Sequence, residues 1–413
     1  MRRLGAVCAA LLVVAGCNND APAVSGQTFV RPGTTAWHRV VPSDALPAGV
    51  AADLSNNNLD ILLYQGRLWF AFRTAPTHFA STETTMYLLS TDDVEGLRDW
   101  RLETTVHTGK DIREPRLFVV DDRLFFYFSE LGTELTSFDP DGVKGMVRAD
   151  DGSWSEPVTI FADARVVWRI KELDGRVWMT SYRGTSKVFE ELDPFVPIDV
   201  MFSTTDDGWT WRGVDGGDEV VLRAAGLSEV GFASAPAGAL FSVIRAENAD
   251  PRGFGSRLCQ APPGDWKTWR CRERNDPHKY DSPLMFRYRD RLYLIARYNP
   301  AGAYDLAPGE PVTVERWWRN LWNYSATTKR TALYAYDTER WEIRLLDVWP
   351  TNGDTAFASA VWLDNDRLFV FNYSSDPSAP EMSWIEGQLT GSQIYAAVLD
   401  FGAGTPTVGV PVP

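Results

Sequence analysis

The sequence predicts an all-β protein, namely a six-bladed β-propeller built of four-stranded antiparallel blades. The main observation is a β-hairpin pattern that occurs six times: an apolar run, a tight turn containing Asp, Asn or Gly, and a second apolar run. The copies follow one another at about 50 to 75 residues, a spacing typical of propeller blades. The chain is also rich in tryptophan, with 17 in 413 residues, and propeller blades use such rings to pack sheet on sheet.

The six hairpins divide the chain into consecutive units. The hairpins lie at residues 62–70, 118–126, 173–179, 236–241, 288–294 and 363–370. The corresponding units are residues 56–110, 111–163, 164–224, 225–275, 280–348 and 353–400. Because a closed array of repeats forms one domain, we expect a single propeller domain over residues 36–413.

One segment departs from the β pattern. Between residues 314 and 329, Trp317, Leu321 and Trp322 recur at spacings that predict a short amphipathic helix. Two interpretations of this helix are open. It is either an aromatic lid that stacks on sugars or an insertion whose rings are buried against the propeller.

The N-terminal residues resemble a bacterial lipoprotein signal. A basic start and a short apolar stretch, too short for a stable membrane anchor, lead to Val-Ala-Gly-Cys at residues 14–17, which is similar to a lipobox. This resemblance implies that residues 1–16 are a signal peptide, that Cys17 carries the lipid, and that the protein lies in the bacterial cell envelope. Asn18 implies sorting to the outer membrane. An ordinary secretory signal with an incidental cysteine is the alternative, and residues 17–35 predict a flexible tether.

The remaining two cysteines, Cys259 and Cys271, flank a strong turn signal, Pro-Pro-Gly-Asp at residues 262–265. This spacing places them opposite each other on paired strands and predicts a disulfide, as is usual in an oxidising compartment. The four histidines are scattered without metal-ligand spacing, so neither a metal nor another cofactor is predicted.

The charge balance argues against one class of partner. The formal net charge of −14 disfavours nucleic acid, which requires a basic surface. The sequence contains no sign of oligomerisation, so we expect a monomer that touches the membrane only through its lipid.

Residues 204–211 resemble the Asp box of sialidases. They read Thr-Thr-Asp-Asp-Gly-Trp-Thr-Trp, against the pattern Ser/Thr-x-Asp-x-Gly-x-Thr-Trp, and weaker copies lie at residues 90–93 and 149–154. In such a turn the Asp accepts hydrogen bonds from backbone amides, the Gly adopts an angle that other residues avoid, and the Trp packs between strands. The resemblance implies a sialidase-like propeller with BNR repeats. An Asp box identifies architecture, because it lies away from the active site.

The residue six positions after each turn arginine, or its equivalent, ends an apolar strand. These residues are Arg73, Ser129, Tyr182, Arg245, Arg297 and Tyr373. An arginine there is costly to bury unless it meets an anion or a carboxylate. The sialidase resemblance implies that Arg245 and Arg297 match two arginines of a carboxylate-binding triad, and that Glu229 matches the glutamate that partners the nucleophile. The alternative is that each arginine pairs with a structural acid.

The chain also departs from the sialidase pattern. Phe357 stands where sialidases have their tyrosine nucleophile, and it has no oxygen to form a covalent intermediate. Tyr373 lies a strand further on and is a poor substitute. The first arginine of the triad and the general-acid aspartate have no clear counterpart, so standard sialidase activity is not expected.

A closer resemblance is to poorly characterised bacterial sialidase-like propellers. The similar elements are Arg73 with His78, residues 111–115, residues 353–355 and residues 372–375. Arg-Glu-Pro at residues 113–115 also resembles the Arg-Asp-Pro element of propeller glycosidases that act on fructosides and arabinosides, which use one acid from each of their first three blades. This second resemblance implies three acids, which are Asp60, then Asp111 or Glu114, then Glu229, although Glu229 falls in the fourth unit.

Three functions remain open. The first is a glycan-processing enzyme in which Glu229, with Asp111 or Asp60, supplies acid/base chemistry. The residues that would bind the sugar are Arg73, His78, Arg113, Glu114, Arg245, Arg297 and Asp354. The second is a glycan-binding lipoprotein without catalysis, which the missing tyrosine favours. The third is a structural or protein-interaction propeller, because propellers carry many functions.

Overall fold

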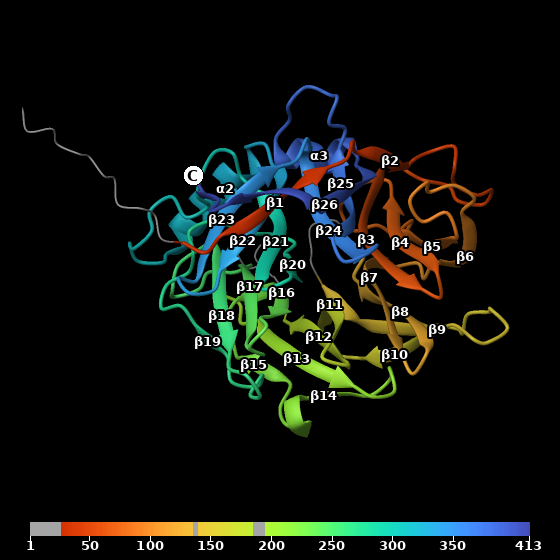
Figure 1. The fold of residues 1–413 in the computed structure, drawn as a ribbon, viewed down its shortest axis with the longest axis horizontal. Coiled ribbons are helices and arrows are strands. Elements are labelled where there is room, and N and C mark those ends of the chain that lie inside the picture. Colours follow the sequence, from red (N-terminus) through yellow and green to blue (C-terminus); the bar gives the residue numbers. More distant parts are fainter. Residues whose placement is uncertain (1–25, 135–138, 185–194) are drawn as a thin grey trace, which may run out of the picture.

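Six antiparallel sheets surround a central axis and form the predicted six-bladed propeller (Figure 1). The computed structural model describes residues 26–134, 139–184 and 195–413. The first blade consists of β3 (Ser55–Tyr64), β4 (Arg67–Ala75), β5 (Thr85–Thr91) and β6 (Arg101–Val106). The second consists of β7 (Asp111–Val120), β8 (Arg123–Leu131), β9 (Pro140–Val147) and β10 (Val158–Phe161). The third consists of β11 (Arg165–Leu173), β12 (Arg176–Arg183), β13 (Asp199–Thr205) and β14 (Trp211–Gly213), with β15 (Val220–Leu222) paired to β13. A single 3-10 turn, Val214–Gly216, follows β14.

The other three blades complete the ring. The fourth blade consists of β16 (Leu227–Ser234), β17 (Leu240–Ala246), β18 (Ser256–Ala261) and β19 (Arg270–Cys271). The fifth consists of β20 (Leu284–Tyr288), β21 (Arg291–Tyr298), β22 (Arg330–Asp337), β23 (Glu342–Val348) and β27 (Val410–Pro411). The sixth consists of β24 (Asn352–Trp362), β25 (Arg367–Ser375), β26 (Gln393–Thr407) and β1 (Phe29–Thr34), with β2 (His38–Val41) paired to β26. The six sequence units correspond to these blades, so the predicted fold class is confirmed.

The start and the end of the chain close the ring together. Strand β1 pairs antiparallel with β26, with Phe29 opposite Thr407, and forms the outer edge of the sixth blade. The prediction of a flexible tether over residues 17–35 is therefore wrong for residues 29–34, because these residues form a strand and Phe29 is buried in the core. Cys17 and the predicted signal peptide lie outside the described residues.

The Asp-box-like segment forms a tight turn between β13 and β14, but the aspartate that accepts the backbone amides is Asp207. Asp206, which the box pattern places in that role, forms an ion pair with Arg212 instead. Asp207 Oδ1 accepts hydrogen bonds from the backbone amides of Trp209 and Thr210, both at 2.7 Å. Gly208 has φ +75° and lies against the ring of Phe125, where a Cβ would come within 2.4 Å of a ring carbon. Because only glycine fits this approach, the turn fixes how the third blade meets the second.

The predicted helix is confirmed as α2 (Val314–Ser325), which begins at the N-cap residue Thr313. Trp317 is buried with Tyr304 and Phe254, so the interpretation as a packed insertion holds for this ring. Trp322 lies on the opposite side of the helix and is 78% exposed. Within the described residues, no helix is long and apolar enough to cross a membrane.

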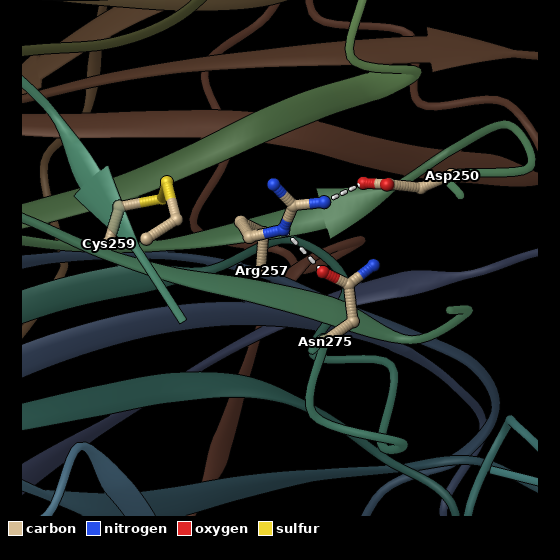
Figure 2. Close-up of a disulfide and its surroundings, with 5 residues drawn as sticks. Asp250, Arg257, Cys259 and Asn275 are labelled. Carbon is tan, nitrogen blue, oxygen red and sulfur yellow. Dashed lines mark hydrogen bonds and ion pairs between the residues drawn. A yellow bond between two sulfur atoms is a disulfide. The ribbon is translucent and has the colours of Figure 1, made fainter. Parts of the chain in front are cut away.

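The predicted disulfide is also confirmed. Cys259 of β18 lies directly opposite Cys271 of β19, and their sulfur atoms are bonded. Figure 2 shows the neighbouring Arg257, which donates hydrogen bonds to Asp250 and Asn275. The disulfide and this buried arginine together attach the two-residue strand β19 and the segment after it to the fourth blade.

Candidate functional site

The first strand of each blade lies beside the central channel, which these six strands (β3, β7, β11, β16, β20 and β24) surround (Figure 1). A cavity of about 600 Å³ lies where these strands begin, and we call it the front cavity. A second cavity, of about 440 Å³, lies where the same strands end, and we call it the rear cavity. Strand β3, for example, contributes Asn58 to the front cavity and Asp60 to the rear cavity.

A layer of stacked aromatic and guanidinium groups separates the two cavities. Trp168 and Phe357 meet edge to face with their ring centroids 5.0 Å apart. Arg116 lies 5.0 Å from the Phe357 centroid, and Arg169 lies 5.3 Å from the Trp168 centroid. Such cation–π contacts stabilise guanidinium groups away from water. These side chains lie between the two cavities: Arg116 and Arg169 line the rear cavity and Phe357 lines the front cavity.

Four residues with left-handed backbone line the front cavity. They are Asn58 (φ 39°), Glu114 (φ 56°), Ser282 (φ 56°) and Phe357 (φ 61°). Three of them lie at breaks in strand register on β3, β7 and β24, which are β-bulges. Non-glycine residues pay a conformational cost there, and such strain concentrates at functional sites. The bulges direct side chains of different blades toward one chamber.

Asp111 holds two arginines at one side of the front cavity. Its Oδ1 lies 2.7 Å from Arg73 Nη2, and its Oδ2 lies 2.5 Å from Arg113 Nε. Thr84 donates a further hydrogen bond to Oδ1 at 2.8 Å. Burial opposes ionisation of Asp111, but Arg113 and Arg73 outweigh it and lower the pKa of this carboxyl. A carboxylate held in this way orients the arginines and is poorly suited to the catalytic role that the sequence predicted.

Glu229 and Arg245 form the centre of a second group. Arg245 Nη1 lies 2.7 Å from Glu229 Oε1, its Nη2 contacts Glu247, and its Nε donates to Ser228. The other oxygen of Glu229 accepts the backbone amide of Ser282 at 2.6 Å. The spacing that the sequence indicated between Glu229 and Arg245 is therefore realised as a direct ion pair.

Arg297 connects a third group. Its Nη1 lies 3.0 Å from Asp281, and its Nη2 lies 3.5 Å from Asp354. His78 Nδ1 contacts the other oxygen of Asp354 at 2.6 Å, and the Tyr373 hydroxyl donates to Asp354 at 3.1 Å. Burial lowers the pKa of His78, even with Asp354 beside it. The imidazole lines the cavity as a hydrogen-bonding group.

Glu114 is the carboxyl group with the weakest ionic partner in the front cavity. Its nearest cation is Arg116 at 3.4 Å, and Asn58 Nδ2 donates to it at 3.5 Å. Burial raises the pKa of Glu114 to about 7; Arg116 opposes the rise, and the charge of Glu229 adds to it. At neutral pH this group is poised between a proton donor and an acceptor, the condition that favours general acid catalysis.

Tyr182 was noted in the sequence as a strand-end residue but received no role. It ends β12, lines the front cavity, and forms no hydrogen bond through its hydroxyl in the described part of the chain. Glu114, Arg245 and Glu229 all act electrostatically on it. The sequence contained one signal for it: Tyr182 occupies the position in its own repeat that Arg73 and Arg245 occupy in theirs.

Helix α3 (Trp384–Thr390) forms the apolar rim of the front cavity. Trp384, Ile385 and Leu389 line the cavity, and Trp384 Nε1 donates to Asp354 at 3.0 Å. Ser383 and Glu386 form a capping box that fixes the start of the helix. The sequence analysis did not predict this element.

The predicted site residues divide into three groups. The front cavity is lined by His78, Asp111, Arg113, Glu114, Glu229, Arg245 and Arg297, with Asp354 directly behind His78. Arg73 is fully buried behind Asp111 and does not line the cavity, so its expected contact with substrate is wrong.

Asp60 is wrong as a catalytic acid of this site, because the bulge after Asn57 places it in the rear cavity. There it accepts hydrogen bonds from Ser359 and from the Leu117 amide.

No family model and no curated protein matches the sequence. Among solved structures, a Dyadobacter fermentans protein of unknown function matches with a TM-score of 0.59 at 15% identity, covering 90% of this chain and 99% of that one. The endosialidase of phage phi92 matches with a TM-score of 0.52 at 11% identity, covering 85% and 68%. Trypanosoma rangeli sialidase in complex with the inhibitor DANA also has a TM-score of 0.52 at 11% identity, covering 84% and 55%. This chain has a sialidase-like propeller fold.

Proposed function

We propose that the protein binds a glycan in the front cavity and hydrolyses a glycosidic bond there, with Glu114 as the general acid and Glu229 as the base or nucleophile. One observation carries the proposal: two buried carboxyl groups line one chamber in unlike surroundings. Glu229 has a guanidinium partner at 2.7 Å and a backbone amide at 2.6 Å, whereas the partners of Glu114 are more distant, Arg116 at 3.4 Å and Asn58 at 3.5 Å. Glycoside hydrolysis requires such a pair, one to donate a proton and the other to activate water or attack.

The balance of charge in the front cavity favours a neutral, hydroxyl-rich sugar. Arg245 and Arg297 are engaged by acids and hydroxyls of the protein itself, so they do not form an open carboxylate clamp. Paired arginines and acids offer alternating donors and acceptors, which suit sugar hydroxyls. Trp384 and the aliphatic side chains of α3 supply the apolar faces on which a sugar ring rests.

Hydrolysis screens with purified protein, followed by Glu114→Gln and Glu229→Gln, test the proposal. We expect each variant to lower kcat by about 10²- to 10⁴-fold. The value of kcat/KM for the wild type is expected to fall above pH about 7, where Glu114 loses its proton. This fall at alkaline pH is expected to be absent from the pH profile of Glu114→Gln. Glu172→Gln, an exposed acid at the rear cavity, is the matched control. Wild-type turnover in both cavity variants would exclude the assigned roles.

Phe357 favours a second candidate, a glycan-binding protein without catalysis. It closes the floor of the front cavity with a ring that has no nucleophilic atom. In that case a glycan array shows binding without turnover, and Glu114→Gln keeps the affinity of the wild type within about threefold.

We further propose that Cys17 is lipidated and anchors the protein in the bacterial cell envelope, at the outer membrane. The sequence around Cys17 supports this proposal through its similarity to a lipobox. Metabolic labelling with a radioactive fatty acid tests it, and Cys17→Ser is expected to abolish both labelling and membrane fractionation.

A further inference from the structure

Two cations of the rear cavity, the buried Arg169 and the half-buried Lys171, have no carboxylate partner within the described residues. Arg169, which is 3% exposed, donates from Nε to the carbonyl of Pro283 at 3.2 Å and from Nη2 to the carbonyl of Ser282 at 3.5 Å. Lys171 donates to the carbonyls of Phe232 and Met285. Within the described residues, neither side chain forms an ion pair, although both line the cavity.

Donor groups on both side chains remain unused. A guanidinium carries five N–H donors and an ammonium three, whereas Arg169 uses two nitrogens and Lys171 makes two hydrogen bonds in the described structure. Neutral carbonyl oxygens satisfy hydrogen bonds but do not cancel charge. Burying an uncompensated charge is expensive, so the cavity favours any anion that enters.

Asp60 offsets only part of these charges: it acts electrostatically on Arg169 and Lys171 but forms no ion pair with either within the described residues. Its two oxygens are occupied by the Ser359 hydroxyl at 2.6 Å and the Leu117 amide at 2.8 Å. A third cation, Arg116, also lines the cavity, and its ionic partner is Glu114 on the other side of the layer between the two cavities. Arg116, Arg169 and Lys171 therefore face Asp60 as the one buried carboxylate among the described residues that line the cavity. The other charged lining residues, Glu172, Asp174 and Arg287, are exposed.

We propose that the rear cavity binds a small oxyanion, with phosphate or sulfate as the ligand class, between Arg169 and Lys171. Arginine and lysine are the side chains that proteins use for such groups. The volume of about 440 Å³ accommodates a free oxyanion or the phosphate or sulfate group of a larger ligand. This inference is independent of the function proposed for the front cavity.

The titration of Lys171 agrees with this proposal. Burial lowers the pKa of Lys171 to about 7, and the charge of Arg169 adds to the effect. The charged groups that face or surround Lys171 on the elements around the cavity are Asp60, Arg116, Arg169, Glu172, Asp174 and Arg287. A bound anion restores the protonated form, so affinity is expected to be higher at pH 6 than at pH 8.

Titration calorimetry of the full-length protein with inorganic phosphate, at constant ionic strength, tests the proposal. We expect saturable binding to one site, and we expect Arg169→Met and Lys171→Met each to weaken it about tenfold or more, since a charged hydrogen bond is lost. Sodium sulfate is a second arm that distinguishes general oxyanion binding from selectivity for phosphate. Absence of saturable binding by the wild type would overturn the proposal.

Arg113→Gln is the matched control, because Arg113 lines the front cavity. Phosphate affinity is expected to remain within about twofold of the wild type in this variant. If Arg113→Gln abolishes binding while Arg169→Met retains it, the anion occupies the front cavity and the proposal is wrong. Circular dichroism of each variant establishes that loss of binding is not loss of fold.

Discussion

The two cavities at the ends of the channel differ in how buried charge is compensated. In the front cavity, Arg113, Arg245 and Arg297 each contact a carboxylate of the protein. In the rear cavity, Arg169 and Lys171 form hydrogen bonds only to backbone carbonyls within the described residues, beside their contacts with aromatic rings. Since inner strands β3, β7, β16 and β24 contribute side chains to both chambers, the fold itself does not decide the difference. The front chamber carries its own counter-charges, whereas the rear chamber leaves this role to a ligand.

The largest effect on stability is expected for Arg73→Met, behind the front cavity. Arg73 and Asp111 are both fully buried, and removal of the arginine leaves a buried carboxylate with Arg113 as its remaining ionic partner. We expect a loss of about 3–5 kcal/mol in the free energy of unfolding, measured by urea denaturation. Arg98→Met, which removes an exposed pair with Asp93, is the control and is expected to cost at most about 1 kcal/mol. Equal effects of the two variants would contradict this account of the front cavity.

Glu114→Gln is expected to have an intermediate effect that depends on pH. Between pH about 4.5 and 7 the unfolded chain ionises Glu114, whereas the folded protein keeps it protonated. Wild-type stability therefore falls as the pH rises through this window, and the variant lacks this loss. Near pH 4 the two proteins are expected to unfold alike. At pH 8 the variant is expected to be more stable by up to about 3 kcal/mol, and a pH-independent difference would argue against a protonated Glu114.

The smallest effect on stability is expected for Arg169→Met in the rear cavity, when no anion is present. Its cation–π contacts and two carbonyl hydrogen bonds are lost, but so is the cost of burying a charge without an ionic partner. We expect a change of at most about 1 kcal/mol in either direction, from urea denaturation in phosphate-free buffer. A loss as large as that of Arg73→Met would show that the rear cations are already compensated within the protein.

The blades could be predicted from the sequence because the two strands of a hairpin are neighbours along the chain. Alternating apolar strands and Asp/Gly turns repeat in every unit, and even the strand-end positions of Arg245 and Arg297 follow from counting along each repeat. The bulges at Asn58, Glu114 and Phe357 were not predictable in this way. They arise from packing between strands and change which side chains share a chamber, which is why Asp60 was misplaced.

The rear cavity was missed for a related reason. Arg169 and Lys171 look like ordinary alternating residues of one strand. Their significance depends on what the inner strands of the other blades contribute to the rear cavity, which is one buried carboxylate, Asp60, and the further cation Arg116. Such an imbalance becomes visible only when all six strands are placed around one axis.

The pairing of β1 with β26 has a consequence for the order of folding. Phe29 lies opposite Thr407, which is far away along the chain, so β1 has no pairing partner until β26 of the sixth blade has been synthesised. Contacts of such large sequence separation form late, because a long loop must first be closed. We therefore expect the ring to close only after β26 has been synthesised, and chains that end before β26 to accumulate as open arrays of blades.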